Sequence, residues 1–470
     1  KPVLTVPAMN VKMWEHSATR RNADWTAKID RMLAAEPLPL IGSNLAQMAM
    51  NVTDTVMLGW YDVTALAAAT LATSLYFLIF IVGSGFAWAV MPVVATAAEA
   101  NDAVMVRRVT RMGIWVGMIY AAVFVPPLMW TEEIFLALGQ EPQVAAAGEA
   151  YLRIAAWAMV PGLVAMVMRS FLSALEHTGV LLWSTLGMAL CNALLNYALI
   201  FGNWGAPELG IQGAAIASLS MAILQAVLLM AYALRRLPEY DLVRRLWRPD
   251  LEVLGRVLRL GAPIGLTSLA EGGLFVATGV MIGWIGAVPL AAHGIALQVT
   301  SVAFMVQVGL SQAATVRAGR ALGRRDETAL RLIGQSGVMM SVISAGLVAL
   351  IFISMPEPFV TAFVDPGDPA RDLVVATGIT LLSLAALFQI VDALQVMALG
   401  LLRGVQDTGV PMVLAAISYW VIGLPAGYVL GFPLGLGAAG VWLGLVVGLG
   451  LAAVTLLWRF WSRSVRIAAA

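Results

Sequence analysis

Long apolar stretches separated by short polar ones dominate the pattern along this chain. Each stretch reaches or exceeds the roughly 20 residues that a helix needs to cross the hydrocarbon of a bilayer, and transmembrane β-strands are much shorter. The pattern therefore predicts an all-α integral membrane protein with twelve transmembrane helices. The expected spans are 38–61, 64–97, 112–131, 143–174, 179–202, 208–234, 260–286, 288–316, 332–355, 373–402, 408–431 and 434–460.

Composition excludes the soluble classes. Hydrophobic residues make up 60% of the 470 residues and charged residues only 12%, about half of what a soluble domain carries. Mean hydropathy is +0.87. The single cysteine, Cys191, rules out a disulfide scaffold.

The placement of basic residues predicts the orientation. Residues 1–36 are mixed and polar, without a cleavable signal, and are expected to form a cytoplasmic lead-in. Lys and Arg cluster there and in alternate loops, whereas the loops between them are acidic or neutral; only Arg153 and Arg371 fall toward the other side. By the positive-inside bias, both termini are expected in the cytoplasm of a multi-pass inner-membrane protein. The basic clusters are Arg107 to Arg111, Arg235 to Arg259, Arg317 to Arg331 and Arg459 to Arg466.

The chain also repeats itself. A shift of 224 residues places Met57, Gly59 and Trp60 on Met281, Gly283 and Trp284. Two six-helix halves that enter the membrane from the same side must be related by a pseudo-twofold along the membrane normal, an arrangement found in transporters. We expect an N-lobe at 37–234, a cytoplasmic linker at 235–259, a C-lobe at 260–460 and a cytoplasmic tail at 461–470.

Three carboxylates fall inside predicted spans: Asp54, Glu271 and Asp392. At 1.5 Å per residue, Glu271 lies about 18 Å and Asp392 about 16 Å from the inner ends of their helices, so both are expected near the midplane. The repeat places Asp54 about 10 Å nearer the outside. Each acid costs about 2.5–3.5 kcal/mol there, which favours a functional role. Without a fixed basic partner, such acids hold protons or bind a cation.

Amide side chains accompany these acids. Asn192 and Asn196 share a helix face at i, i+4, Gln298 lies in the eighth span, and Gln389 precedes Asp392 by nearly one turn. They are candidates for lining a substrate or cation site. The same residue types also join helices through ordinary hydrogen bonds, and the sequence leaves both interpretations open.

Signals of enzymatic chemistry are missing from the sequence. HExxH, CxxC, GxSxG and GxxxxGK[ST] do not occur, and the three histidines are scattered. We therefore expect no enzyme, no nucleotide-driven pump and no cofactor. Transport must then draw on an ion gradient.

Several segments resemble one known family. They are Asn51 to Gly59, Gly261 to Gly265 followed by Glu271, Ala291 to His293, Phe388 to Gln395, and Leu402 to Thr408. The chain resembles the multidrug and toxic compound extrusion (MATE) family, in its bacterial NorM-like branch, from about residue 35 to 460.

The resemblance implies a two-lobed antiporter that exports cationic and amphipathic drugs in exchange for Na⁺ or H⁺. It implies that Glu271 and Asp392 form the cation site of the C-lobe, a Na⁺ site in sodium-coupled members, with Phe388 and Phe275 beside it. Asp54 would be the acidic site of the N-lobe, near Asn192 and Asn196. A monomer in the lipid bilayer, with no nucleic-acid partner, is expected.

Three alternatives belong to other classes. A flippase for lipid-linked oligosaccharides or another lipid shares a related two-lobed fold, but its cleft is expected to carry Arg and Lys for the pyrophosphate, and few lie at depth here. A membrane-embedded transferase needs a His/Asp or metal constellation. A passive channel is compatible with buried acids and is distinguished by uphill transport.

Overall fold

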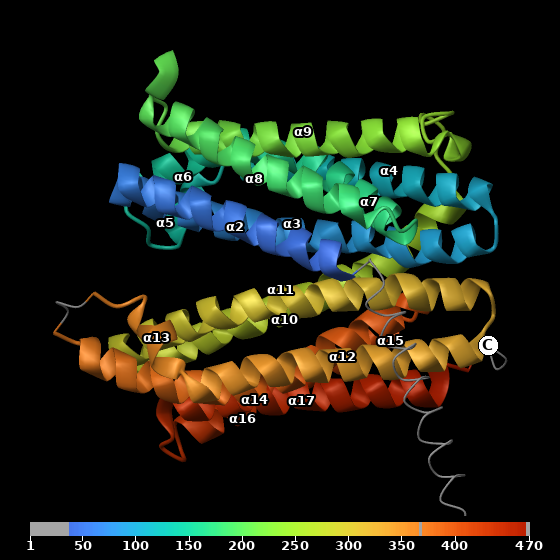
Figure 1. The fold of residues 1–470 in the computed structure, drawn as a ribbon. Helices are drawn as coiled ribbons and strands as arrows, with labels where there is room; N and C mark the ends of the chain where they lie inside the picture. Colours follow the sequence, from blue (N-terminus) through green and yellow to red (C-terminus); the bar gives the residue numbers. More distant parts are fainter. Residues whose placement is uncertain (1–36, 366–368, 467–470) are drawn as a thin grey trace, which may run out of the picture.

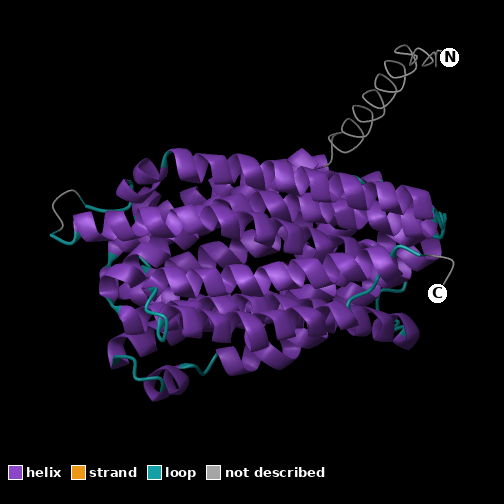
Figure 2. Cartoon of the chain, turned by 90° about the horizontal axis from the view of Figure 1, so that it is seen from below, coloured by secondary structure: helices purple, strands orange, loops and turns teal. Residues whose placement is uncertain are grey.

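The computed structural model describes residues 37–365 and 369–466, and helices form nearly all of this part of the chain. They run nearly parallel in two bundles, which Figures 1 and 2 show from two sides. The N-lobe comprises α2 (Pro37–Tyr61), α3 (Val63–Glu99), α4 (Ala103–Leu128), α5 (Glu132–Ala137), α6 (Pro142–Ala155), α7 (Met159–Ala174), α8 (Thr178–Phe201) and α9 (Ile211–Arg236). The C-lobe comprises α10 (Leu251–Ile285), α11 (Ala287–Gly323), α12 (Glu327–Ser354), α13 (Pro356–Thr361), α14 (Arg371–Gly404), α15 (Gly409–Ala416), α16 (Leu424–Gly431) and α17 (Gly437–Arg459).

Eleven helical segments in the described residues are long and apolar enough to cross a membrane. Two of them are composite: α6 and α7 join through Ala156–Ala158, and α15 and α16 join through the π-helical segment Ile417–Gly423. The twelfth expected span is α2, whose 25 residues are long enough but include Asn44, Asn51 and Asp54. All twelve predicted spans are therefore helical, and α2 is the most polar of them.

The expected boundaries were wrong where basic residues begin or end a helix. The helix α4 begins at Ala103 instead of 112, α10 at Leu251 instead of 260, and α12 at Glu327 instead of 332. Residues 251–259 of the predicted linker are thus the first turns of α10. The helix that ends the C-lobe also continues as a π-helical turn to Ser464, into the predicted tail. The expected lead-in at 1–36 lies outside the described residues.

Aspartates explain several of these starts. The side chains of Asp102, Asp250 and Asp326 each accept a hydrogen bond from the backbone N–H three residues on, at the N-termini of α4, α10 and α12. A carboxylate at this position satisfies an otherwise unpaired donor of the first turn. Hydrophobicity alone misses these helical turns, because they are polar and extend beyond the apolar spans.

The arginines gather at one end of the bundle, here called the Arg-rich end. Contacts between distant segments establish this: Arg108 pairs with Asp250, Arg324 with Glu99, and Arg459 with Asp407. Arg153, an exception to the sequence bias, pairs with Glu149, and a buried Glu149 oxygen also accepts the N–H of Glu132.

The two lobes touch near the Arg-rich end. A Cβ on Gly85 of α3 would lie 2.3 Å from the backbone N of Gly265 on α10, and a Cβ on Gly309 of α11 would lie 2.9 Å from the Cα of Ile41 on α2. Only glycine permits backbones to approach this closely. The lobes are therefore joined by direct backbone packing of α3 on α10 and of α2 on α11.

The same helix faces are exposed toward the other end. On α3, Leu78 and Ser74 follow Gly85 at helical spacing and are exposed. On α11, Gln298 and Gly294 lie on the face of Gln312 and Gly319 and are exposed too. A face that is packed at one end and open at the other means that the lobes diverge. The space between these faces is called the interlobe cleft below.

Candidate functional site

The N-lobe brings Asp54 together with the two predicted asparagines. Asp54 lies on α2, and the Oδ1 of its carboxylate accepts hydrogen bonds from the Nδ2 atoms of Asn192 and Asn196, one turn apart on α8. Their shared face is confirmed. Both asparagines are fully buried, and the Oδ1 atom of each lacks a hydrogen-bond partner. Tyr151 of α6 is close enough to interact electrostatically with Asp54. Three free or partly free oxygens therefore surround one point.

The C-lobe brings Glu271 and Asp392 together. Glu271 lies on α10 and Asp392 on α14, and the two carboxylates interact electrostatically. Neither oxygen of Asp392 has a hydrogen-bond partner, and the same holds for Oε1 of Glu271. Gln389, fully buried beside Asp392 on α14, leaves both of its side-chain polar atoms unpaired. Buried polar groups are nearly always paired, so this concentration of unpaired oxygens is unusual.

Aromatic side chains border this acidic pair. Phe388 stands one turn before Asp392, with its ring centre 6.0 Å from that of Phe275 and 5.6 Å from that of Trp442. Trp442 donates its indole N–H to Nδ1 of His293, 3.1 Å away. The predicted Phe388 and Phe275 are thus neighbours, and His293 is a hydrogen-bonded core residue.

Three further residues belong to the C-lobe cluster and were not among the predicted site residues. The Tyr419 hydroxyl accepts a hydrogen bond from Nε2 of Gln395, 2.7 Å away, and Tyr419 interacts electrostatically with Glu271 and Asp392. Tyr419 belongs to the π-helical segment Ile417–Gly423, and such segments recur at functional sites. Gln395 was detectable, because it lies three residues beyond Asp392. Tyr419 carried no signal apart from a polar group in an apolar span.

Arg403 corrects one expectation. The sequence places it near a helix end, away from the acids, whereas the structure brings its charge within electrostatic reach of Glu271. Its guanidinium carbon lies 5.7 Å from the ring centre of Trp88 on α3. Among the described residues no ion pair joins Arg403 to Glu271, so the acidic pair keeps its unpaired oxygens.

Gln298 lies elsewhere. It is exposed on the face of α11 that borders the interlobe cleft, and the predicted site therefore separates into three groups. One is inside the N-lobe, one is inside the C-lobe, and Gln298 lies between the lobes.

The chemistry of both acidic groups suits a small hard cation or a proton. Carboxylate and amide oxygens are the ligands that such cations prefer, and Glu271, Asp392 and Gln389 supply them. Softer ligands do not join them: within 37–365 and 369–466, no three His, Cys, Asp or Glu residues gather as for a transition metal.

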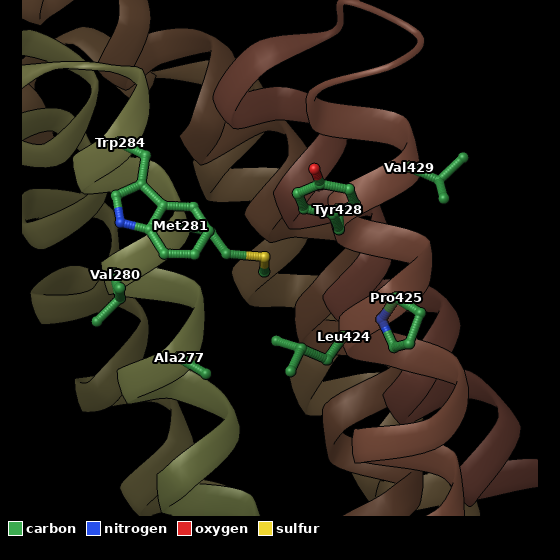
Figure 3. A pocket seen from close by; sticks show the side chains of 8 residues that line it. All are labelled: Ala277, Val280, Met281, Trp284, Leu424, Pro425, Tyr428 and Val429. Carbon is green, nitrogen blue, oxygen red and sulfur yellow. The ribbon is translucent and has the colours of Figure 1, made fainter.

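The largest pocket found is separate from these acids. It has a volume of about 630 Å³ and lies between α10 and α16. Figure 3 shows Met281 and Trp284 directed from α10 toward Leu424 and Tyr428. All of its lining residues except Tyr428 are wholly apolar, apart from the Trp284 indole N–H, so this pocket is not the cation site.

Comparison with protein families gives one result. The MatE family model matches twice, over residues 39–198 and 263–429. The starts of the two matches are separated by the same shift as the sequence repeat, which places a second copy of the same unit in each lobe.

Curated relatives match nearly the whole chain. A probable multidrug resistance protein NorM of Rhizobium meliloti is 47% identical over 92% of this chain and 93% of its own length. A multidrug resistance protein NorM of Burkholderia vietnamiensis is 38% identical over the same shares.

Solved structures agree on the fold. A MATE crystallised with MaL6 has a TM-score of 0.86 at 18% identity, covering 94% of this chain and 97% of the other. The eukaryotic MATE transporter AtDTX14 has a TM-score of 0.80 at 20% identity, covering 94% and 98%. Together with the double match and the close relatives, this establishes that the chain is a multi-pass membrane protein of the MATE family.

Proposed function

We propose that this protein is a secondary active multidrug efflux transporter that exchanges cationic and amphipathic drugs for Na⁺ or H⁺. Family membership and the multidrug resistance names of the relatives support export of drugs. The observation that carries the ion exchange is the set of unpaired oxygens on Glu271, Asp392 and Gln389 in the C-lobe interior. Buried acids without a fixed positive partner gain most from a mobile cation.

The exchange follows from competition for the same negative charge. When the interlobe cleft is open, Na⁺ or H⁺ enters and neutralises Glu271 and Asp392 or Asp54. Rocking of the two lobes then opens the Arg-rich end, where the ion leaves and a cationic drug takes its place. Because each acidic group lies within one lobe, the lobes move as units without dismantling either group.

The orientation follows from the arginines. Placing the Arg-rich end in the cytoplasm of the inner membrane satisfies the positive-inside bias and puts both termini there. The interlobe cleft then opens toward the outside. We further propose lobes close to 37–234 and 251–464 and a monomeric protein, since each lobe contains its own acidic group.

Removal of the buried charge tests the proposal. Asp392→Asn keeps the size of the side chain and removes its charge. We expect normal amounts of this variant in the membrane and loss of energised ethidium efflux from cells. Asp372→Asn is the matched control, because Asp372 is exposed in the first turn of the same helix. Undiminished efflux in Asp392→Asn would contradict the proposal.

The coupling ion needs a separate measurement. In everted vesicles at fixed pH, an imposed Na⁺ gradient drives ethidium transport if Na⁺ is the partner. A pH gradient drives it without Na⁺ if H⁺ is the partner. Glu271→Gln is expected to abolish the response to whichever gradient is active, and transport driven by neither gradient would overturn the antiport mechanism.

A further inference from the structure

Four helices end in the same way at the Arg-rich end. They are α3 and α7 of the N-lobe and α11 and α14 of the C-lobe. After each helix comes a residue with positive φ that is not glycine: Asn101 (56°), Glu176 (66°), Arg325 (54°) and Gln406 (62°). Side chains rarely adopt this backbone conformation. The sequence repeat places Asn101 on Arg325 and Glu176 on Gln406, so the four ends are two pseudo-symmetric pairs.

Two of these residues reach across to the other lobe. Glu176 forms an ion pair with Arg320 of α11, which also donates to the carbonyl O of Ala174, 3.2 Å away. Gln406 donates from Nε2 to the hydroxyl of Thr96 on α3, 3.2 Å away. The repeat that aligns α3 with α11 places Thr96 on Arg320. The two contacts are therefore equivalent by pseudo-symmetry, one ionic and the other neutral.

Further contacts seal the space between them. Arg324 of α11 pairs with Glu99 of α3 at 2.8 Å, and the Thr96 hydroxyl donates to the carbonyl O of Gly319, 3.0 Å away. A Cβ on Gly323 would lie 2.6 Å from the carbonyl O of Thr96. The ends of α3 and α11 thus touch through their backbones, and the interlobe cleft is closed at this end.

We propose that Thr96–Gln406 and Glu176–Arg320 are the two halves of the gate at the Arg-rich end. This inference rests on the alternating access proposed above, because the rocking that opens this end separates both pairs. The ionic half, Glu176–Arg320, contributes more to the closed state. The neutral half, Thr96–Gln406, holds the other side of the pseudo-twofold with less energy.

The two equivalent positions therefore respond in opposite directions. Glu176→Gln removes the charge from the ionic half and favours opening. Gln406→Glu adds a charge to the neutral half, where Arg256 of α10 already donates to Oε1 of Gln406 at 2.8 Å. The added carboxylate makes that contact ionic, holds the side chain toward Thr96, and favours closure.

Spin-label distances measure the gate directly. The full chain in lipid nanodiscs carries labels at Ala100→Cys and Thr328→Cys, two exposed positions at the Arg-rich end in different lobes. Cys191 is exposed and is replaced by alanine. For Glu176→Gln, the ratio of long to short distances is expected to rise about two- to fivefold, as for a partly exposed ion pair. For Gln406→Glu, it is expected to fall.

Arg331→Gln provides the matched control. Arg331 pairs with Glu327 at 2.7 Å, one turn away on the same helix and at the same end of the bundle. Losing that pair leaves the two lobes unaffected, so the distances are expected to match the parent. An equal shift in Arg331→Gln, or no shift in Glu176→Gln, overturns the proposal.

Exchange of the two charges tests the pairing itself. Glu176→Arg and Arg320→Glu are each expected to favour opening, and the double variant is expected to return toward the parent distances. A double variant no closer to the parent than the single ones overturns the pairing. Ethidium efflux by the parent is measured alongside: its absence overturns the proposed function, whereas the distances alone decide the gate.

Discussion

Asn196 on α8 donates a hydrogen bond from its Nδ2 atom to Oδ1 of Asp54 on α2, 2.5 Å away. Asn192, one turn earlier on α8, donates to the same oxygen. Two amides from one helix thus hold a single carboxylate oxygen of another, and the second carboxylate oxygen remains available to a cation.

Replacing Asn196 by alanine tests this arrangement. Asn196→Ala removes one charge-assisted hydrogen bond, which contributes about 1.5–3 kcal/mol, and leaves the Asp54 carboxylate less firmly placed. We expect the half-saturating concentration of the coupling ion in ethidium efflux to rise about tenfold or more. Asn203→Ala is the control, since Asn203 makes only a 3.4 Å exposed contact with the Tyr197 carbonyl. Equal ion dependence in the two variants would contradict a role for Asn196.

Removing the hydroxyl of Tyr419 tests the C-lobe cluster. Tyr419→Phe leaves the buried Nε2 of Gln395 without its 2.7 Å partner, at a cost of about 1–3 kcal/mol. We expect a lower thermal unfolding temperature in detergent together with reduced efflux. Tyr428→Phe, at an exposed position of α16, should change neither quantity.

A double variant separates stability from transport at this position. Adding Gln395→Leu to Tyr419→Phe removes the unpaired donor, and we expect the unfolding temperature to recover while efflux stays low. Recovery of efflux as well would mean that Tyr419 acts only through stability.

A methyl group at the lobe crossing is expected to prevent close contact of the lobes. A Cβ on Gly265 of α10 would lie 2.5 Å from the carbonyl O of Val82, and overpacking costs about 1–3 kcal/mol or more. We expect Gly265→Ala to lengthen the distance between labels at Ala100→Cys and Thr328→Cys and to reduce efflux. Gly272→Ala lies two turns along the same face, where a Cβ meets nothing within 4 Å, and should behave like the parent.

The ion pair at the start of α10 predicts a pH dependence. Arg108, 2.5 Å from Asp250, holds the pKa of that carboxyl below its ordinary value. The ionised form is thus favoured in the folded protein. Its contribution, about 0.2–1 kcal/mol for a pair of this exposure, is present above pH of about 4 and is lost as the pH falls through the lowered pKa.

Asp250→Asn isolates this contribution, because asparagine caps a helix about as well as aspartate. We expect a lower unfolding temperature than the parent at pH 7 and a difference that shrinks below pH of about 4. Asp326→Asn, at the equivalent start of α12, changes a cap for which no arginine partner is seen in the described residues. A constant difference at every pH would argue against the Arg108–Asp250 pair.

Local sequence was enough to predict the helices and the repeat. A bilayer offers no water to the backbone, so each long apolar stretch must be helical, and the count of spans followed. The helix starts were missed where polar turns capped by Asp102, Asp250 and Asp326 extend beyond the hydrocarbon. Such turns carry no hydrophobic signal.

The site was predicted in part. Buried acids are rare enough that Asp54, Glu271 and Asp392 could be recognised one at a time, and spacing along α8 paired Asn192 with Asn196. Gln298 was grouped with them by residue type, yet it faces the interlobe cleft. Residue type gives cost in the membrane but does not tell which neighbour a side chain faces.

The sequence by itself determined the number of spans, the twofold repeat and the acids in the membrane, because each depends on a residue's own solvation or on its distance along the chain. Tertiary structure alone decided that Tyr419 joins Gln395, that Arg403 comes near Glu271, and that Glu176 meets Arg320 across the lobes. These contacts join helices far apart in the chain, and their positions are set by how backbones pack at glycines such as Gly85 and Gly319.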